Sequence, residues 1–305
     1  MIRALLAKLP VKSGDWKCWR MSLCLSQIAE SGKKIINISD QKVNFGTFSA
    51  DNLALKDRPL FGETYTLFAG DDTEHVEPIL SRTRQILAAS ANIKAISVQD
   101  AADAVDLAYS ERLHKEIENR VLRKRGFTID SFRNEGRQKC TPSDYLNLCT
   151  RIDKVSLSLK FIVSGFSGPD SKDGSNGRIF TIDGMSAPKS CTPIGMWAIG
   201  SGKTAALGWL AYHIERLNVN WLSSEAEALY YGLTARFMAE TDVNVGRGDT
   251  VIYIAERGKP IRYANYSLIQ AVRQIWEQEG APQVPKNLEE RMTELIMTEM
   301  KSLGD

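Results

Sequence analysis

The stretch "GSGKT" at residues 200–204 has the composition of the end of a nucleotide-binding phosphate loop. Such a loop needs a second glycine five positions before its last one, so that backbone amides can surround the phosphates. The last glycine here is Gly202 and the required position holds Trp197, while Gly195 and Gly200 stand at other offsets. An indole cannot make the tight turn that glycine makes there. The pattern therefore disfavours a P-loop NTPase, whose test would be nucleotide binding.

Side chains that commonly perform metal or acid–base chemistry are sparse. The histidines and cysteines are His75, His114, His213, Cys18, Cys24, Cys140, Cys149 and Cys191. They show no metal-ligand spacing and no CxxC pair, so we expect no metal site and no cofactor. Because the three histidines are few and far apart in the sequence, a histidine-based catalytic triad is disfavoured. An odd number of cysteines is typical of a reducing compartment, which predicts a cytoplasmic protein.

The composition is that of a globular protein, with 43% hydrophobic and 25% charged residues among 305. A net charge of +2 creates no general attraction to nucleic acid or membrane. No run approaches the roughly 20 apolar residues of a membrane span. Residues 1–20 are cationic and mildly amphipathic, and three interpretations stay open: a targeting peptide, an ordered extension, or residues upstream of the true start.

Alternating and helical apolar patterns predict the order strands, two helices, strands, two helices, strands. Two apolar runs joined through "ESGKK" favour a hairpin, and Ser224 with Glu227 forms a capping box. The expected helices lie at about 73–89, 97–124, 203–217 and 223–241, and the expected strands at about 23–28, 35–38, 64–72, 158–168, 178–184, 195–202, 249–258 and 260–264. This order predicts an α+β fold of antiparallel sheets with helix pairs on both sides.

The chain divides into one main domain and three accessory segments in this prediction. The domain covers 22–280, with a helical insertion at about 119–157 of one or two short helices. Residues 1–21 form an N-terminal extension, and residues 281–305 form an amphipathic helix with an acid-rich polar face. Such a face favours packing against protein over membrane.

Five stretches together resemble the proteasome β-subunit group of N-terminal nucleophile (Ntn) hydrolases. This group includes the peptidase subunit of the bacterial two-component ATP-dependent protease. The stretches are "SLCLSQIAESGKKIINISD" (22–40), "LALK" (53–56), "LFAGDD" (67–72), "GRIFTIDG...WAIGSG" (177–202) and "AETDVNVGRGDTVIYI" (239–254). Each alone is short, and their order and spacing carry the resemblance. It implies a four-layer αββα sandwich.

The resemblance assigns Ser22 as a nucleophile whose own α-amino group is the general base. An α-amine has a reference pKa of about 8, so it can accept a hydroxyl proton near neutral pH. The amine must be free, which requires removal of residues 1–21 as a propeptide, or translation from Met21 followed by loss of that methionine. Taken alone, Ser22 is better explained as an ordinary strand residue.

Three further residues match the family pattern around the nucleophile. Lys56 corresponds to the lysine that lowers the amine's pKa and stabilises negative charge, and Asp40 to the carboxylate that orients it. Gly70 corresponds to the glycine whose amide forms the oxyanion hole. The alternatives are a surface lysine, a turn aspartate and a strand-ending glycine.

The resemblance also explains "GSGKT": Ser201 is the strand-end serine near the nucleophile, and Lys203 begins a helix. Asp242 matches the acid that, with Ser201, holds the terminal amine. The chain departs from the proteasome pattern at Val245, where a serine is expected three residues after the aspartate. This departure leaves open whether the site is active.

The resemblance implies a peptidase that takes peptide or protein substrates, forms a homo-oligomer such as a ring, and is compatible with an ATPase partner. Two alternatives remain: an Ntn amidase acting on a non-peptide amide, and a non-catalytic proteasome-fold subunit or scaffold with a blocked N-terminus. The sequence predicts neither substrate preference nor oligomer size.

Overall fold

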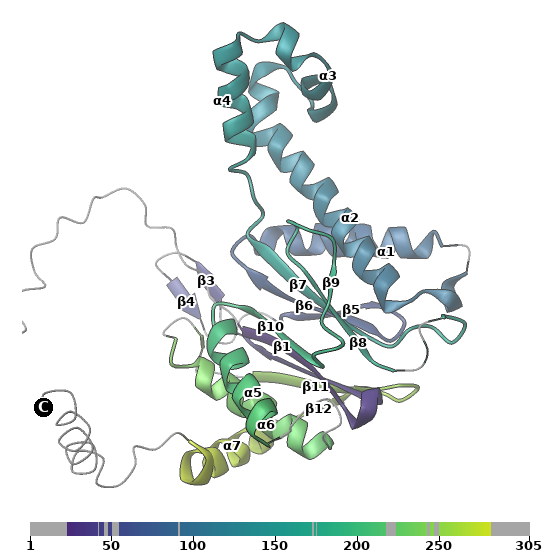
Figure 1. Ribbon diagram of the computed structural model, residues 1–305, viewed down its shortest axis with the longest axis vertical. Coiled ribbons are helices and arrows are strands. Elements are labelled where there is room, and N and C mark those ends of the chain that lie inside the picture. Colours follow the sequence, from purple (N-terminus) through teal and green to yellow (C-terminus); the bar gives the residue numbers. More distant parts are fainter. Residues whose placement is uncertain are drawn as a thin grey trace, which may run out of the picture.

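The computed structural model describes residues 23–41, 43–45, 48–50, 55–90, 92–172, 174, 176–217, 224–242, 245–246 and 250–281. Ser22, the predicted extension 1–21 and residues 282–305 of the predicted C-terminal helix lie outside this part of the chain. The described residues form two five-stranded antiparallel sheets, a short hairpin and a set of helices (Figure 1).

The first sheet has the strand order β10-β1-β2-β11-β12. Its strands are β1 (Leu23–Ala29), β2 (Lys34–Asp40), β10 (Met196–Gly200), β11 (Thr250–Glu256) and β12 (Arg262–Tyr263). The predicted hairpin is confirmed: β1 and β2 pair antiparallel, with Cys24 opposite Ser39. The turn between them passes through Ser31 and Gly32, both with positive φ, which explains the glycine in "ESGKK".

The second sheet has the order β5-β6-β7-β8-β9. Its strands are β5 (Asp57–Phe61), β6 (Thr64–Gly70), β7 (Leu159–Gly165), β8 (Arg178–Ile182) and β9 (Lys189–Ser190). A separate hairpin pairs β3 (Val43–Phe45) with β4 (Phe48–Ala50). Strands β3, β4, β5 and β9 were not predicted. Strand β5 was missed because it contains charged residues and a proline. An edge strand tolerates such residues.

A buried apolar cluster joins the two sheets face to face. It contains Cys24, Ile28, Leu67, Ala69, Ile162, Ile179, Cys191, Ile199 and Tyr253. Polar groups also cross this interface, since the Ser164 hydroxyl donates to Asn37 Oδ1 at 3.2 Å. Because side chains of successive strand residues point to opposite faces, the other face of each sheet is free for helices.

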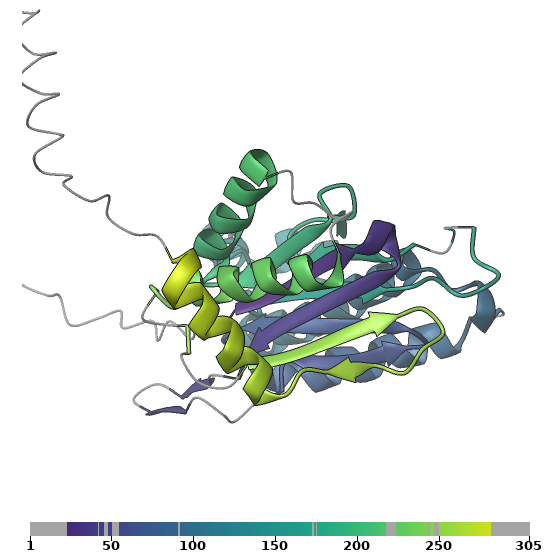
Figure 2. The same cartoon turned by 90° about the horizontal axis from the view of Figure 1, so that it is seen from below.

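Two helices cover the second sheet, α1 (Val76–Ala88) and α2 (Val98–Ile117), and their shared cluster includes Ile79, Leu80 and Phe161. The first sheet packs against α5 (Lys203–Leu217), α6 (Glu225–Ala239) and α7 (Tyr266–Ile275) (Figures 1 and 2). The structure therefore confirms a mixed α+β protein with two antiparallel sheets. It matches the predicted span of α5 and the Ser224 capping box, whereas α7 was not predicted.

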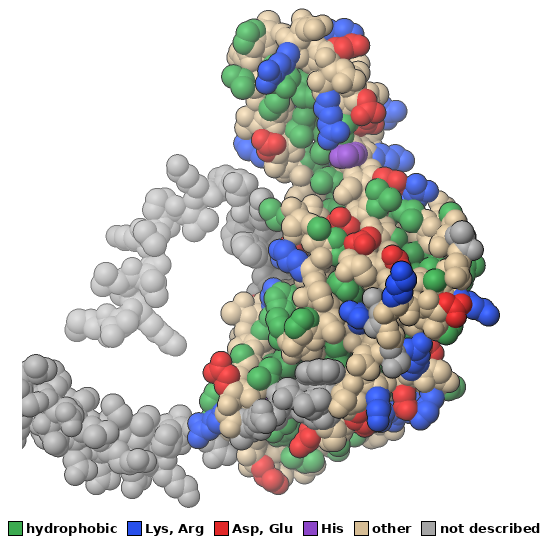
Figure 3. All heavy atoms as spheres, turned by 45° about the vertical axis from the view of Figure 1, so that its right-hand side comes forward, with side chains coloured by type: hydrophobic (Ala, Val, Ile, Leu, Met, Phe, Trp, Pro, Cys, Tyr) green, Lys and Arg blue, Asp and Glu red, His purple; other side chains and the backbone are tan. Residues whose placement is uncertain are grey.

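Helices α3 (Ile129–Lys139) and α4 (Pro142–Ile152) lie within the predicted insertion 119–157. With the end of α2 they form an arm that extends away from the sheets (Figures 1 and 3). The arm has its own apolar cluster, in which the Phe132 and Tyr145 rings stack with centroids 5.2 Å apart. None of the helices in the described ranges is long and apolar enough to cross a membrane.

Candidate active site

A buried ion pair joins the two sheets at one end of the sandwich. The Lys56 ammonium donates to Asp40 Oδ1, and the two side chains are 4% and 1% exposed. Asp40 is the last residue of β2, and Lys56 directly precedes β5. Burying two charges costs several kcal/mol unless both are well paired. Because Lys56 is buried and Asp40 belongs to β2, the alternatives of a surface lysine and a turn aspartate are wrong.

The Asp40 carboxylate also holds two backbone amides. Leu23 N–H donates to Oδ1 at 3.1 Å, and Gly246 N–H donates to Oδ2 at 3.4 Å. Leu23 is the residue to which Ser22 is covalently joined. The structure thus gathers Asp40, Lys56 and the beginning of β1 at one place, although Ser22 itself is outside the described residues.

Ser201 lies near the same strand beginning. Leu23 is paired with Gly200 in the register of β1 and β10, and Ser201 follows directly. Its hydroxyl is buried and makes no hydrogen bond to the part of the chain that the structure describes. A Cβ added to the next residue, Gly202, would lie 3.6 Å from Leu23 Cβ and 2.6 Å from Val245 Cγ2. The turn from β10 to α5 therefore packs against both segments.

Gly70 ends β6 with a φ of +150°. A Cβ there would lie 2.0 Å from the Ser158 carbonyl oxygen, so the backbone approach requires glycine. Two contacts tie its strand to the site: Phe68 N–H donates to the Lys56 carbonyl at 3.1 Å, and Cys24 Sγ donates to the Phe68 carbonyl at 3.2 Å. These contacts place the β6 strand, rather than the Gly70 amide itself, beside the Asp40–Lys56 pair.

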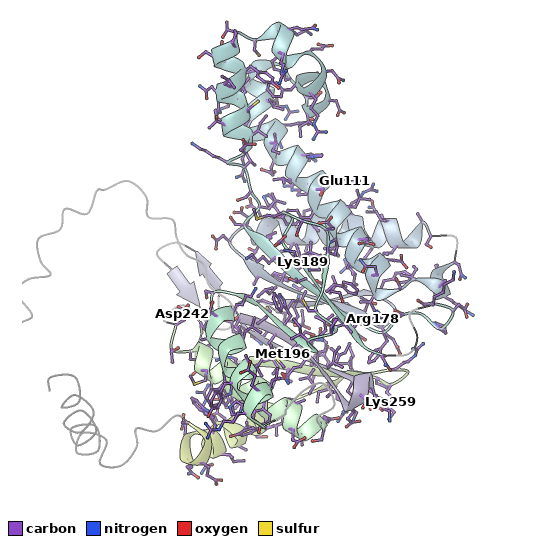
Figure 4. All side chains as sticks on the ribbon, in the orientation of Figure 1. Glu111, Arg178, Lys189, Met196, Asp242 and Lys259 are labelled. Atoms are coloured by element: carbon purple, nitrogen blue, oxygen red, sulfur yellow. The ribbon has the colours of Figure 1, made fainter. Side chains whose placement is uncertain are left out.

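Asp242 follows the end of α6. Its N–H donates to the Ala239 carbonyl at 3.0 Å, and its own carbonyl accepts from Val245 N–H at 3.0 Å. Figure 4 shows Asp242 at one end of the sandwich, with Lys259 at the opposite end. Val245 is 2% exposed and belongs to the apolar cluster beneath the first sheet. The residue that departs from the proteasome pattern thus has a packing role next to Gly202.

A second set of charged residues beside the site was not predicted. Arg236 is fully buried on α6 and donates to Glu240 and to the Gly246 carbonyl. Glu240 also accepts from Arg273 on α7, with 2.9 Å between Nη1 and Oε2. The i, i+4 spacing of Arg236 and Glu240 is a sequence signal for a helical ion pair. It does not indicate burial, because most such pairs are on surfaces.

Burial also sets the chemistry of the thiol closest to the site. Cys24 is fully buried between the sheets, and this burial raises the pKa of its thiol, while nearby Lys56 opposes the effect. A thiol that stays protonated is a poor nucleophile. Cys24 therefore acts as a structural donor to β6.

The "GSGKT" stretch has no phosphate-loop geometry. It follows an edge strand, β10, that is antiparallel to β1. The Lys203 ammonium lies 4.1 Å from the centre of the Trp197 ring, so a cation–π contact engages the lysine. Burial lowers the pKa of Lys203, with a further lowering from Lys160. The indole that is unsuited to the loop instead packs against the lysine.

A cavity of about 620 Å³ adjoins the ion pair. Its lining includes Gln41, which follows Asp40, and Leu55 and Asp57, which flank Lys56. Tyr263 and Tyr266 form part of the wall. Burial raises the pKa of Asp57, and its own backbone hydrogen bond opposes this rise. Among the described residues, no group of three or more His, Cys, Asp or Glu side chains is arranged to hold a metal ion.

Comparison with known protein families found no matching family model, and comparison with curated proteins found no significant match.

Proposed function

We propose that this chain is an Ntn hydrolase of the proteasome β-subunit type, in which Ser22 attacks an amide bond. The observation that carries the proposal is the pair of bonds to Asp40 Oδ1, one from the Lys56 ammonium and one from the Leu23 amide. A buried positive charge is thereby held next to the residue that follows the candidate nucleophile. Such preorganised charge stabilises an oxyanion that develops nearby.

The arrangement of the elements supports this function in a second way. Helices lie on one outer face of each sheet and the sheets face each other, as a four-layer αββα Ntn sandwich requires. Three sequence-predicted site residues meet at Leu23: Asp40 accepts from its amide, Lys56 donates to the same carboxylate oxygen, and Ser201 follows Gly200, which pairs with Leu23.

In the proposed reaction, Ser22 Oγ attacks the carbonyl carbon of the substrate amide, and its proton moves to the Ser22 α-amine. As the resemblance implies, the oxyanion accepts a hydrogen bond from the Gly70 amide, and the positive charge of Lys56 stabilises it. The C–N bond of the substrate then breaks, and the substrate amine leaves with the proton that the Ser22 α-amine had accepted. An acyl-enzyme ester remains on Ser22. The Ser22 α-amine then takes a proton from a water molecule, which hydrolyses this ester. The cycle consumes one water and requires no redox partner.

The proposal depends on a free amine at Ser22. A chain that starts at Met21 and loses that methionine has this amine, whereas a chain from Met1 carries an amide there. We expect the shorter chain to hydrolyse fluorogenic peptides or acyl amides, and the full chain to do so only after cleavage before Ser22. Intact mass and N-terminal sequencing identify the species that is active.

Ser22→Ala and Lys56→Met are the test variants, and Ser224→Ala is the control because Ser224 caps a helix on the surface. Loss of turnover in Ser22→Ala and Lys56→Met, but not in Ser224→Ala, supports the site. Turnover that survives Ser22→Ala, or a pure Ser22-terminal chain that hydrolyses neither substrate type, contradicts it. A non-catalytic proteasome-fold scaffold would then be favoured.

Peptide substrates and a homo-oligomeric ring in the cytoplasm remain part of this proposal, as does the option of an ATPase partner. A comparison of peptide and small acyl-amide substrates separates a peptidase from an Ntn amidase.

A further inference from the structure

A chain of charged side chains, half-buried at Arg273 and buried at Glu240 and Arg236, leads from α7 to the Asp40 carboxylate. Arg273 on α7 is bonded to Glu240, Glu240 to Arg236, and Arg236 to the Gly246 carbonyl. The N–H of Gly246 in turn donates to Asp40 Oδ2 at 3.4 Å. The Gly246 residue is therefore held from two sides, by a guanidinium at its carbonyl and by a carboxylate at its amide.

The burial of Arg236 is unusual for its position. Its relative exposure is 0%, and the buried residues near it on α6, such as Leu233, Ala235 and Phe237, are apolar. Burial lowers the pKa of Arg236, and the charges of Glu240 and Asp40 oppose this lowering. An apolar side chain of similar size is often as stable or more stable than a buried ion pair. The guanidinium is therefore better explained by what it positions than by stability.

Arg273 is itself fixed in place. Its guanidinium carbon lies 4.0 Å from the centre of the Phe237 ring, and its two terminal nitrogens contact the Glu240 carboxylate. The fork of a guanidinium can bind two acceptors at once, which Arg236 does with Glu240 and Gly246. A lysine has no such planar fork.

We propose that Arg236 is a positioning residue for the candidate site: with Glu240 and Arg273 it fixes Gly246, whose amide orients the Asp40 carboxylate. With Oδ2 held by Gly246, Oδ1 is directed at Lys56 and at the Leu23 amide. The catalytic consequence rests on the proposed function, whereas the restraint on Gly246 does not. Both can be measured separately.

The first experiment measures hydrogen exchange of the Gly246 amide by NMR in the wild type, Arg236→Met, Arg236→Lys and Glu240→Gln. Leu233→Ala is the matched control, because Leu233 is also fully buried on α6 but belongs only to the apolar cluster. We expect local exchange of Gly246 to accelerate at least about tenfold in Arg236→Met and less in Arg236→Lys. Leu233→Ala should change the exchange rate of the Gly246 amide only through its effect on global stability. Equal protection in Arg236→Met and Leu233→Ala at matched stability overturns the proposal, whether or not the protein is an enzyme.

The second experiment measures kcat and KM for each folded variant over pH, corrected for the folded fraction. A misplaced charge lowers kcat, and we expect a loss of about tenfold to a hundredfold in Arg236→Met with KM changed less than about threefold. Arg236→Lys should recover part of the loss, and the pH at half-maximal rate should shift in Arg236→Met but not in Leu233→Ala. If Arg236→Met does not fold, Glu240→Gln replaces it. Glu240→Gln should also accelerate the exchange of the Gly246 amide and lower kcat. Absence of both effects in Glu240→Gln and Arg236→Lys overturns the proposal.

A wild type without turnover contradicts the proposed function, and the exchange measurement still decides the role of Arg236.

Discussion

The amide of Leu23 and the carboxylate of Asp40 are joined by a 3.1 Å hydrogen bond between the first residue of β1 and the last residue of β2. The same oxygen accepts from Lys56, which directly precedes the first strand of the second sheet. One carboxylate oxygen therefore ties the start of the domain to both sheets. The proposed function places the reaction of Ser22 next to this junction, because Ser22 is joined to Leu23.

The Asp40–Lys56 pair should be strongly coupled in stability. Asp40→Asn leaves the Lys56 ammonium buried without its countercharge, and we expect a loss of about 3–5 kcal/mol in the free energy of unfolding. Asp40→Asn combined with Lys56→Met should cost less than the sum of the two single changes. Urea unfolding of the four proteins measures the coupling, and additive losses would show that the two groups do not interact.

Gly70 should not tolerate a side chain. Alanine there would place Cβ 2.0 Å from the Ser158 oxygen at a φ of +150°, and we expect a loss of about 2–4 kcal/mol. Gly208 is the control, because it is exposed in α5 and a Cβ there meets nothing within 4 Å. Gly208→Ala should gain about 0.5–1 kcal/mol. Thermal unfolding compares them, and a Gly70→Ala protein as stable as Gly208→Ala would contradict this backbone geometry.

Glu225 should make stability depend on pH. Its pKa is lowered to about 2, first by the hydrogen bond from Arg262 and then by Lys34, while partial burial opposes the shift. A carboxylate with a depressed pKa in the folded state stabilises the protein above its unfolded pKa of about 4.3. That stabilisation is lost as the pH falls from there through about 2.

We therefore expect Glu225→Gln to lower stability by about 0.5–1 kcal/mol at pH 7, since the pair is partly exposed and screened by solvent. The difference from the wild type should disappear between about pH 4.3 and pH 2. Glu277→Gln, at an exposed position, should leave stability unchanged at both ends of this range. A Glu225→Gln deficit that persists unchanged at pH 2 would exclude an electrostatic origin.

The cysteines should differ in their reactivity. Cys24 is buried with a raised pKa, and burial raises the pKa of Cys191 to about 11, whereas Cys140 and Cys149 are half-buried in the arm. Iodoacetamide should modify Cys140 and Cys149 in the folded protein, and Cys24 only after unfolding. Peptide mass mapping at increasing denaturant follows each thiol. Native-state labelling of Cys24 as fast as Cys140 would mean that the two sheets do not pack as described.

Local patterns were sufficient to predict much of the fold. The hairpin of β1 and β2 follows from two apolar runs around a glycine, and the helix after "GSG" follows from apolar residues at helical spacing. The Ser224 capping box was visible because its two members are three residues apart. Such features depend on neighbours in sequence. Helix α7 was missed although its buried Ile269 and Val272 have helical spacing.

The sequence by itself determined most of the strands and helices and the types of residue available for chemistry, since propensity, capping and periodicity are local properties. The family resemblance implied that Asp40 orients Lys56, but only the tertiary structure decided that both are buried and that Arg236 reaches them through Gly246. The reason is physical. The cost of burying a charge depends on partners that arrive from other elements, and these partners become neighbours only when the two sheets and α6 have packed.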